Sequence, residues 1–520
     1  MADIVLINPK FEMSFWGLEA ALPFLGKRAN LPVGALPLLA ALTPPPHSIT
    51  VIDENVEEID YERCRRADIV GVTGMSVQRH HMRSVLVRLK GMGCYTVVGG
   101  PWISVSEDDF GELADVIFVG EAEETWPRFL ADWSAGAAQA RYEQDEKTDM
   151  SKVPTPRFDL LKMNRYAFGS IQFSRGCPFQ CEFCDIIVIY GRKPRIKTRR
   201  QIIGELDALL ATKTSLIFVV DDNLIGNKKV MKDILRHVGD WQRERGYPFT
   251  FVTEASLDLS DDSEMMNLMV RANFNGVFVG IESIDERALR ETKKTQNMRN
   301  SGTMVEKVER IHRSGLEVWA GMIVGFDSDA EDVFENQLAF VEAAQISVVM
   351  VGMLSAIPKT PLYARLEKER RLDLTDPPLH GTNVIPLKMN QKRLSSGYAR
   401  LMMDLYEPKA FFTRVDSMWL AGPLRAEPGW RQYASTRPVA RILKQARGWI
   451  EACVLAARLA VQMRDSALRN FYLRRFMGAI RHRPDGVLLR LYVIRCLMHY
   501  HLLALSRQLQ RDGAAPINTY

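Results

Sequence analysis

The chain has 520 residues, more than one hydrophobic core usually accommodates, so two or three domains are expected. Its composition of 47% hydrophobic and 25% charged residues excludes a disordered chain. The sequence has no run of 18 consecutive apolar residues, and no basic segment precedes an apolar one at the N-terminus. It therefore predicts neither a membrane-spanning helix nor a signal peptide.

Residues 1–135 are predicted to form a doubly wound, Rossmann-like α/β domain. Short runs rich in β-branched residues alternate with helical patterns between Ile4 and Leu130, as in a parallel sheet covered on both faces. Ligands of such sheets bind at the carboxyl ends of the strands. Small and polar residues gather at this predicted edge: Asn8, Asp53, Asn55, Thr73, Gly74, Met75, Ser76, Gln78, Gly99, Gly100, Pro101, Gly120 and Glu121. Alone, they indicate only a doubly wound domain, because glycines after strands also serve tight turns.

Residues 136–165 are predicted to be a polar linker, and a second β/α series follows over residues 166–358. Its predicted strands lie near residues 171–173, 216–220, 249–253, 277–280, 318–324 and 348–354, with helical patterns between them. Six such units are too few to close an eight-stranded barrel with ordinary spacing.

Three cysteines, Cys177, Cys181 and Cys184, have the spacing C-x3-C-x2-C. Three thiolates can hold three irons of a [4Fe–4S] cluster and leave the fourth iron open to a ligand. Structural zinc usually takes four N/S ligands, and no second cysteine pair or Cys/His cluster lies nearby. Three unrelated core cysteines would rarely show this spacing beside glycine and proline, so the cluster is the favoured interpretation.

The other cysteines are scattered and are predicted to be core residues: Cys64, Cys94, Cys453 and Cys496. A cluster together with free thiols indicates a reducing cytoplasm.

In the cysteine motif, with Phe183 just before the last cysteine, the sequence resembles the radical SAM superfamily. The resemblance implies a partial (β/α)6 barrel in which S-adenosylmethionine (SAM) chelates the open iron and is cleaved to a 5′-deoxyadenosyl radical. Positions similar to the family's SAM contacts are Phe183, Asp221, Asp222, Glu254, Glu282, Ser283, Gly321, Ile323 and Gly325. Carboxylates suit the ammonium and ribose groups, although acidic strand ends also serve as helix caps. No catalytic residue beyond the cluster ligands is assigned.

Placed directly before such a barrel, the first domain resembles the cobalamin-binding domain of the B12-dependent radical SAM class. The turns at residues 99–101 and 120–123 match that class, where they approach the nucleotide tail of the cofactor. The resemblance also places the loop after the third strand under the corrin, so Met75, Ser76 and Gln78 are the preferred contacts there. The listed edge residues of the first domain are thus predicted to bind cobalamin.

No Asp-x-His-x-x-Gly motif supplies a lower histidine ligand to cobalt, and many methyltransferases of this class lack it too. His80 and His81 follow the third predicted strand. Either one contacts the cobalt or the corrin, or both are polar residues of the next helix, and the helix is favoured.

The cluster loop continues into a basic run from Tyr190 to Lys197. Such a run is a solvated face, a phosphate contact or a docking site for an acidic electron donor. A reductase or a flavodoxin- or ferredoxin-type protein is the expected donor.

Residues 359–520 are predicted to be a basic helical domain, with one helix over 397–412. Residues 431–520 hold 16 Lys and Arg against 4 Asp and Glu, a net of +12 within a chain total of +5. From Arg441 to Leu509, arginines alternate with large apolar residues. The pattern leaves three interpretations open: the helices pack on one another, they lie on an anionic membrane surface, or they contact nucleic acid. No nucleic-acid module is recognised, so no such partner is expected.

The resemblance runs through all three parts and is closest, over residues 172–178, to the subgroup that includes the hopanoid C-2 methyltransferases. It implies methyl transfer from cobalamin to an unactivated carbon of a small apolar molecule, a hopanoid-like lipid. The enzyme alternative is an oxidative cyclase that acts on a tetrapyrrole without methyl transfer, and the non-enzyme alternative is a B12- or redox-sensing cluster protein. The expected location is cytoplasmic, with peripheral contact at the inner face of the membrane.

Overall fold

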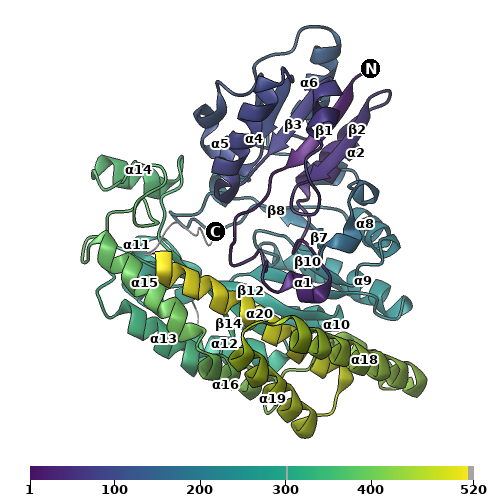
Figure 1. Ribbon diagram of the computed structural model, residues 1–520, viewed down its shortest axis with the longest axis vertical. Helices are drawn as coiled ribbons and strands as arrows, with labels where there is room; N and C mark the ends of the chain where they lie inside the picture. Colours follow the sequence, from purple (N-terminus) through teal and green to yellow (C-terminus); the bar gives the residue numbers. More distant parts are fainter. Residues whose placement is uncertain (300–301, 513–520) are drawn as a thin grey trace.

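The computed structural model describes residues 1–299 and 302–512 and has an α/β architecture with two parallel sheets and a helical C-terminal part. Figure 1 shows the first sheet above the second, with the C-terminal helices along the lower side of the second sheet. The predicted fold class is confirmed.

The first sheet has six parallel strands in the order β2-β1-β3-β4-β5-β6. The strands are β1 (Asp3–Asn8), β2 (Ser48–Asp53), β3 (Ile69–Thr73), β4 (Thr96–Gly99), β5 (Val116–Val119) and β6 (Arg141–Glu143). Its helices are α2 (Ala35–Leu42), α3 (Tyr61–Arg66), α4 (Arg79–Gly91), α5 (Pro101–Val105) and α6 (Thr125–Ser134). Ile4 and Leu6 pack with α2 and α6, whereas Val5 and Ile7 pack with α4 on the other face, as the two-residue period of a strand requires. Strand β6 extends the sheet into the segment expected to be a linker.

The second sheet is open and parallel, in the order β14-β13-β12-β11-β10-β7. The strands are β7 (Gly169–Ile171), β10 (Leu216–Val219), β11 (Thr250–Ala255), β12 (Phe274–Glu282), β13 (Glu317–Val324) and β14 (Val348–Met353). Its helices are α8 (Arg199–Ala211), α9 (Lys228–Glu244), α10 (Ser263–Arg271), α11 (Glu286–Glu291), α12 (Met304–Ser314) and α13 (Val333–Ala343). Helix α8 begins at a capping box of Thr198 and Gln201, and α12 at one of Thr303 and Glu306. Six strands without closure agree with the partial barrel expected from the resemblance.

Two short antiparallel strands, β8 (Ser174–Arg175) and β9 (Arg195–Ile196), frame the cysteine motif together with helix α7 (Ile186–Ile189). A further short helix, α1 (Leu22–Leu25), lies in the long connection between β1 and α2.

The C-terminal part is helical. It contains α14 (Pro361–Lys368), α15 (Gln391–Leu405), α16 (Pro408–Trp419), α17 (Pro428–Ala434), α18 (Pro438–Gln462), α19 (Ser466–His482) and α20 (Gly486–Asp512). The single helix expected over residues 397–412 is wrong, because α15 ends at Leu405 and Pro408 starts α16. Proline has no N–H to donate within a helix and is favoured in the first turn of a new one.

Helix α20 belongs to the main core. Leu497 and Leu502 of α20 share one buried cluster with Val318 of β13. Among the described residues, this helix is the one stretch that is long and apolar enough to cross a membrane, with a mean hydropathy of 1.3 over its most apolar window. Since 67% of that window is buried inside the protein, α20 resembles the core helix of a folded domain.

Candidate functional site

The cysteine motif lies in a tight loop between β8 and β9. Gly176 has φ +90°, and a Cβ atom there would lie 2.9 Å from the carbonyl oxygen of Gly191. The N–H of Cys177 donates to that same carbonyl at 3.3 Å. Only glycine allows the two limbs of the loop to approach this closely, which brings the basic run back toward the first cysteine.

Side-chain amides point at two of the thiols. Asn223 Nδ2 lies 3.9 Å from Cys177 Sγ, and Gln296 Nε2 lies 3.5 Å from Cys181 Sγ. Burial raises the pKa of the Cys177 thiol and raises that of Cys184 well above its usual value. The thiols therefore need a metal to become thiolates, and amide donors suit the negative charge that thiolates and sulfides of a cluster carry.

The donor set fits a cluster better than a single ion. Within residues 1–299 and 302–512, no group of three or more His, Cys, Asp or Glu side chains converges on one metal position. Three thiolates match the cysteine ligands of a [4Fe–4S] cluster with one open iron, whereas structural zinc usually takes four N or S ligands. The cysteine loop is suited to the cluster expected from the sequence.

Two carboxylates after β10 hold this loop. Asp221 accepts hydrogen bonds from the N–H of Phe173 at 2.7 Å and from Ser174 Oγ at 2.6 Å. Asp222 accepts one from the N–H of Gly176 at 2.7 Å. Burial raises the pKa of Asp221 to about 6 and that of Asp222 to about 7. Both side chains position the cysteine loop, and their predicted contact with SAM stays a prediction.

Glu254 and Glu282 end neighbouring strands beside these aspartates. Burial, together with the negative charges of Asp222, Asp221 and Glu282, raises the pKa of Glu254 to about 8. Glu282 has φ +61° and forms an ion pair with Lys294 at 2.7 Å. Lys294 is the cation that lowers the pKa of Glu254. A cationic ligand beside Glu254 would favour its ionised form, and SAM carries both a sulfonium and an ammonium group. The predicted contacts of Glu254 and Glu282 with SAM stay predictions.

The remaining predicted SAM contacts are two apolar residues, one serine and two glycines. Phe183 and Ile323 belong to an apolar cluster in which the rings of Phe183 and Phe326 lie 6.2 Å apart. Ser283 Oγ accepts a hydrogen bond from the N–H of Asp285 at 3.1 Å. A Cβ atom at Gly321 would lie 2.8 Å from the Phe278 ring, and one at Gly325 would lie 2.8 Å from Leu394. A side chain at either position would crowd its neighbour, and Gly325 also has φ +103°, a conformation that favours glycine.

Four predicted cobalamin contacts form a hydrogen-bonded network at the carboxyl edge of the first sheet. Gln78 donates to Asn8 Oδ1 at 2.9 Å, and Asn8 donates to Asp53 Oδ1 at 3.0 Å. Asn55 also donates to Asp53 Oδ1, at 2.7 Å, and Tyr166 donates to Asp53 Oδ2 at 2.7 Å. Because Asn8, Asp53 and Gln78 are buried, they fix the loops rather than present free polar groups.

The loop after β3 is more open. Met75 is 43% exposed, and Ser76 is half-buried at the start of the next turn. Gly100 lies against this loop, since a Cβ atom there would be 2.5 Å from Thr73 Oγ1 and 3.0 Å from the carbonyl oxygen of Gly74. His80 and His81 lie in α4, where His81 Nε2 is 2.6 Å from Glu54 Oε2 and His80 is exposed.

A cavity of about 140 Å³ opens at the same edge. Predicted residues that line it are Thr73, Gly99, Gly100, Pro101, Gly120 and Glu121. Its opposite wall is apolar and is formed by leucines of α2, including Leu36, Leu39 and Leu42, which the sequence reasoning missed. No atom lies within 4 Å of a Cβ position built at Gly120, so this turn leaves open space. Glycine turns on one side and an apolar wall on the other are features that could hold part of a corrinoid. The predicted cobalamin contacts stay predictions.

The cavity adjoins the cysteine loop through a buried ion-pair network. Glu121 Oε1 lies 2.8 Å from Arg175 and 2.9 Å from Arg195, and Glu123 lies 2.6 Å from Arg175. Thr148 adds a backbone hydrogen bond to Glu121 at 3.0 Å. The sequence reasoning missed Arg175 and Arg195 as site residues, although one directly precedes Gly176 and the other lies in the basic run.

These contacts narrow the interpretation of the basic run. Arg195 pairs with Glu121, and Lys197 is buried against Glu205 at 2.5 Å. Neither cation is available to a docking partner. Arg192 and Lys193 remain exposed at the outer turn of the loop.

Comparison with known proteins agrees with this geometry. The Radical SAM superfamily profile matches residues 171–337, and the profile of a domain of unknown function (DUF4070) matches residues 360–514. An uncharacterized methyltransferase of Synechocystis sp. is 39% identical over 417 residues, which cover 79% of this chain and 77% of the relative. The hopanoid C-2 methylase of Rhodopseudomonas palustris is 31% identical over 522 residues, which cover 99% of this chain and 95% of that protein.

The radical SAM methyltransferase TsrM from Kitasatospora setae, solved with cobalamin and a [4Fe–4S] cluster, shares the fold. It superposes with a TM-score of 0.62 at 14% identity over 85% of this chain and 100% of TsrM. The sequence-based expectation of an enzyme that uses a cluster and SAM is confirmed, and the redox-sensing alternative is not supported. The chain therefore belongs to the radical SAM methyltransferase family that includes hopanoid C-2 methylase, and it has the fold of the cobalamin-dependent radical SAM enzymes.

Proposed function

We propose that this enzyme transfers a methyl group to an unactivated carbon of a small apolar, hopanoid-like lipid and uses cobalamin as the methyl carrier. The observation that carries the proposal is the 31% identity with hopanoid C-2 methylase over 99% of this chain, including the C-terminal helices. The cavity at the edge of the first sheet, beside the cysteine loop, supports the choice of cobalamin.

The residues of the two sites would divide the work. Cys177, Cys181 and Cys184 would hold the cluster. Glu282 would attract the positive charges of SAM, and Glu254 would ionise once a cation lies beside it. When bound, the cluster and SAM supply a radical that removes hydrogen from carbon, and cobalamin supplies the methyl group.

Glu121 and Arg175 would fix the separation of the two sites, because their ion pair is buried and joins the cavity to the cysteine loop. Positioning of this kind places the reacting groups within reach of one another.

The test is an anaerobic incubation of the reconstituted enzyme with methyl-labelled SAM and a total lipid extract. Label in a hopanoid-type lipid, absent with the Cys181→Ala variant, is the expected result. Deoxyadenosine without labelled lipid would contradict the lipid substrate. Parallel incubation with a tetrapyrrole tests the cyclase alternative, and an oxidised tetrapyrrole formed with deoxyadenosine but without label would overturn the proposal.

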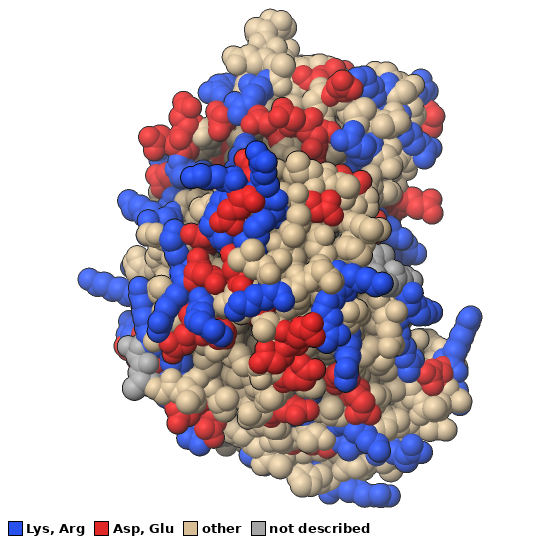
Figure 2. All heavy atoms as spheres, turned by 90° about the vertical axis from the view of Figure 1, so that its left-hand side faces the viewer, with Lys and Arg blue, Asp and Glu red and all other residues tan. Residues whose placement is uncertain are grey.

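We also propose that Arg192 and Lys193 receive an acidic flavodoxin- or ferredoxin-type electron donor. Both lie at the exposed outer turn of the cysteine loop, where a donor would approach the cluster. Figure 2 shows basic and acidic side chains interspersed over the face that it displays, without one broad field of a single charge. Replacing both by Gln should slow reduction by flavodoxin and leave reduction by dithionite unchanged.

A further inference from the structure

Helix α18 presents an apolar face to the surface. Six of its large side chains are between 46% and 83% exposed: Val439, Ile442, Leu443, Ile450, Val454 and Val461. Ala446, Cys453 and Ala457 are exposed as well. At about 100° per residue, these nine positions fall within roughly one third of the circumference of the helix. The whole set is called the α18 face.

The opposite side of the helix accounts for its packing. Ala452, Ala456 and Leu459 are buried against the rest of the C-terminal part. The α18 face is therefore additional to the core contact and runs along a helix of 25 residues, about 37 Å long. Helix α18 lies at the lower edge of the molecule, with one side away from the sheets (Figure 1).

Arginines border the α18 face, and the one acidic residue of the helix forms ion pairs within the protein. Arg447 and Arg458 are exposed on one edge of the face, and Arg464 is exposed just past the end of the helix. Glu451, the one acidic residue of α18, pairs with Arg447 at 2.7 Å and with Arg490 at 3.0 Å. An apolar stripe with a cationic border matches the interface of an anionic bilayer, where apolar side chains enter the acyl boundary and arginines contact phosphates.

A second copy of the chain is a poorer match. A two-fold contact through the α18 face would bring two arginine-bordered edges together without an exposed acid on either helix. Like charges across a contact are unfavourable. Charge complementarity thus favours an anionic lipid surface over a second copy of the chain as the partner of the α18 face.

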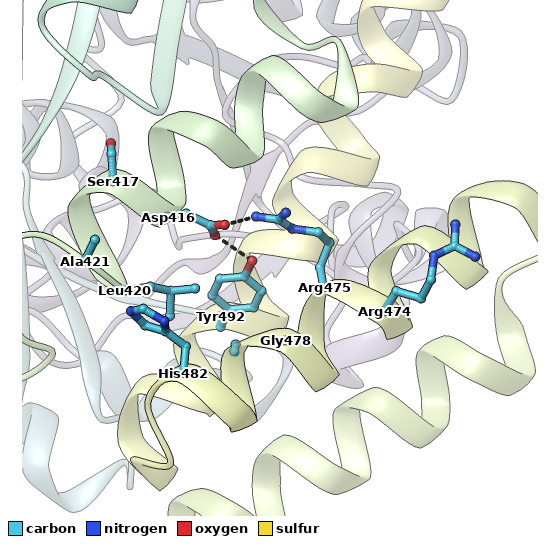
Figure 3. Close-up of a pocket in the computed structure, with 10 residues that line it drawn as sticks. Asp416, Ser417, Leu420, Ala421, Arg474, Arg475, Gly478, His482 and Tyr492 are labelled. Carbon is cyan, nitrogen blue, oxygen red and sulfur yellow. Dashed lines mark hydrogen bonds and ion pairs between the residues drawn. The ribbon is translucent and has the colours of Figure 1, made fainter.

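Among the described residues that follow α18, Met477 is the one large apolar side chain that is exposed, at 48%. In α19, Arg475 points to Asp416, which also accepts a hydrogen bond from Tyr492 at 2.8 Å (Figure 3). These side chains line a hollow of about 460 Å³. Helix α20 is largely buried. The membrane contact expected for the whole tail is thereby narrowed to one helix.

The α18 face is also connected to the second sheet. Arg458 donates to the carbonyl oxygen of Phe24 at 3.0 Å, in the connection that holds α1. In the same connection, the Trp16 ring lies 5.2 Å from the Phe278 ring of β12 and 6.0 Å from the Phe218 ring of β10. We propose that the α18 face docks the enzyme on an anionic membrane surface and sets this connection next to the bilayer. The proposal goes beyond the methyl transfer and does not depend on which substrate is used.

The first test is co-sedimentation of the reconstituted enzyme with vesicles of phosphatidylcholine and phosphatidylglycerol. A triple variant, Ile442→Gln, Leu443→Gln and Ile450→Gln, should lower the partition coefficient by about tenfold or more, because each replaced side chain is 65% exposed. The matched control replaces three exposed aliphatic residues elsewhere, Val87→Gln, Leu374→Gln and Leu379→Gln, and should bind as the wild type does.

Arg447→Gln with Arg464→Gln should weaken binding to the anionic vesicles at low salt and leave the small binding to pure phosphatidylcholine unchanged. Equal loss in the matched control, or no vesicle binding by the wild type at any salt concentration, overturns the proposal.

Cys453 provides an independent reporter that leaves the helix intact. Its thiol is exposed in the middle of the α18 face, so an environment-sensitive maleimide can be attached in a Cys94→Ser background. Vesicles should shift the emission of the probe to the blue. An unchanged spectrum, or a dimer in sedimentation velocity that the Gln triple variant abolishes, would assign the face to another occupant. Without vesicles, the Gln triple variant should form deoxyadenosine at the rate of the wild type. This control separates a loss of membrane binding from a failure of the proposed methylation.

Discussion

Single residues outside the cysteine motif hold it in shape. Asp222 fixes the N–H of Gly176 at 2.7 Å, and Gln296 reaches Cys181 from a distant part of the chain at 3.5 Å. The sequence predicted that carboxylates gather at this edge because strand ends in parallel sheets meet there. It did not predict which of them bind the loop, because hydrogen-bond partners depend on how distant segments approach.

The cysteine ligands themselves give the sharpest prediction at this scale. Cys181→Ala should abolish cluster binding and reductive SAM cleavage, because two thiolates do not hold the cube. Iron content and anaerobic deoxyadenosine formation measure both. Cys453→Ala, an exposed cysteine outside the loop, should retain both properties. Deoxyadenosine at wild-type rates from the Cys181 variant would refute the ligand assignment.

The buried pair of Arg175 and Glu121 makes a prediction about stability. Arg175→Met should lower the free energy of unfolding by about 3 kcal/mol, because buried Glu123 loses its ion-pair partner and Glu121 keeps only Arg195. Urea unfolding of the anaerobic protein provides the measurement. Arg157→Met, which breaks the exposed pair with Asp159, should cost about 1 kcal/mol or less. Equal effects of the two substitutions would show that the Arg175 network is not desolvated in solution.

At the scale of elements, alternation of apolar residues was the reliable signal. Ile4 to Ile7 predicted a strand buried on both faces, and β1 has that burial. The proline at position 408 also carried the signal for a helix start, but the predicted helix extended across it. Strand β6 was missed because three residues are too few for periodicity to identify.

Helix α12 carries a buried histidine that makes stability depend on pH. Burial lowers the pKa of His312 from 6.5 to about 4. The unfolded chain therefore binds this proton at a higher pH than the folded protein, and stability falls as the pH drops from about 6.5 toward 4. When the pH is lowered from 7 to 5, the free energy of unfolding should fall by about 2 kcal/mol less in His312→Leu than in the wild type. Urea unfolding at the two pH values measures this difference, and His482→Leu, at an exposed position, should behave as the wild type does.

For the whole molecule, the C-terminal helices are continuous with the main core. Glu317 of β13 pairs with Arg495 of α20 and accepts a hydrogen bond from Trp419 Nε1 at 3.0 Å. Composition could not show this, because α18, α19 and α20 all mix arginines with apolar residues. Only their packing decides that α20 is buried and that α18 keeps an apolar face. The prediction that Cys453 lies in the core is wrong, because it is exposed on that face.

A chain that ends at residue 437 should consequently fail to fold. Removing α18, α19 and α20 would expose the apolar side chains of α15 and α16 that pack on α20 and would leave Glu317 buried without Arg495. Soluble yield and circular dichroism are the measurements. Arg495→Met should show the milder form of the same defect, a lowered melting temperature. A soluble truncated protein that still binds the cluster would show that the tail is separable.

The ion pairs of Glu121 with Arg175 and Arg195 also constrain how this architecture can be rearranged. The acidic partner comes from the first sheet and the basic partners come from the hairpin that frames the cysteines. A chimera that joins this N-terminal sheet to the barrel of another enzyme would bury a lone carboxylate unless the arginines were transferred with it. The unit of exchange between such enzymes is therefore the sheet together with the β8–β9 hairpin, and the natural cut between modules lies within the barrel rather than before it.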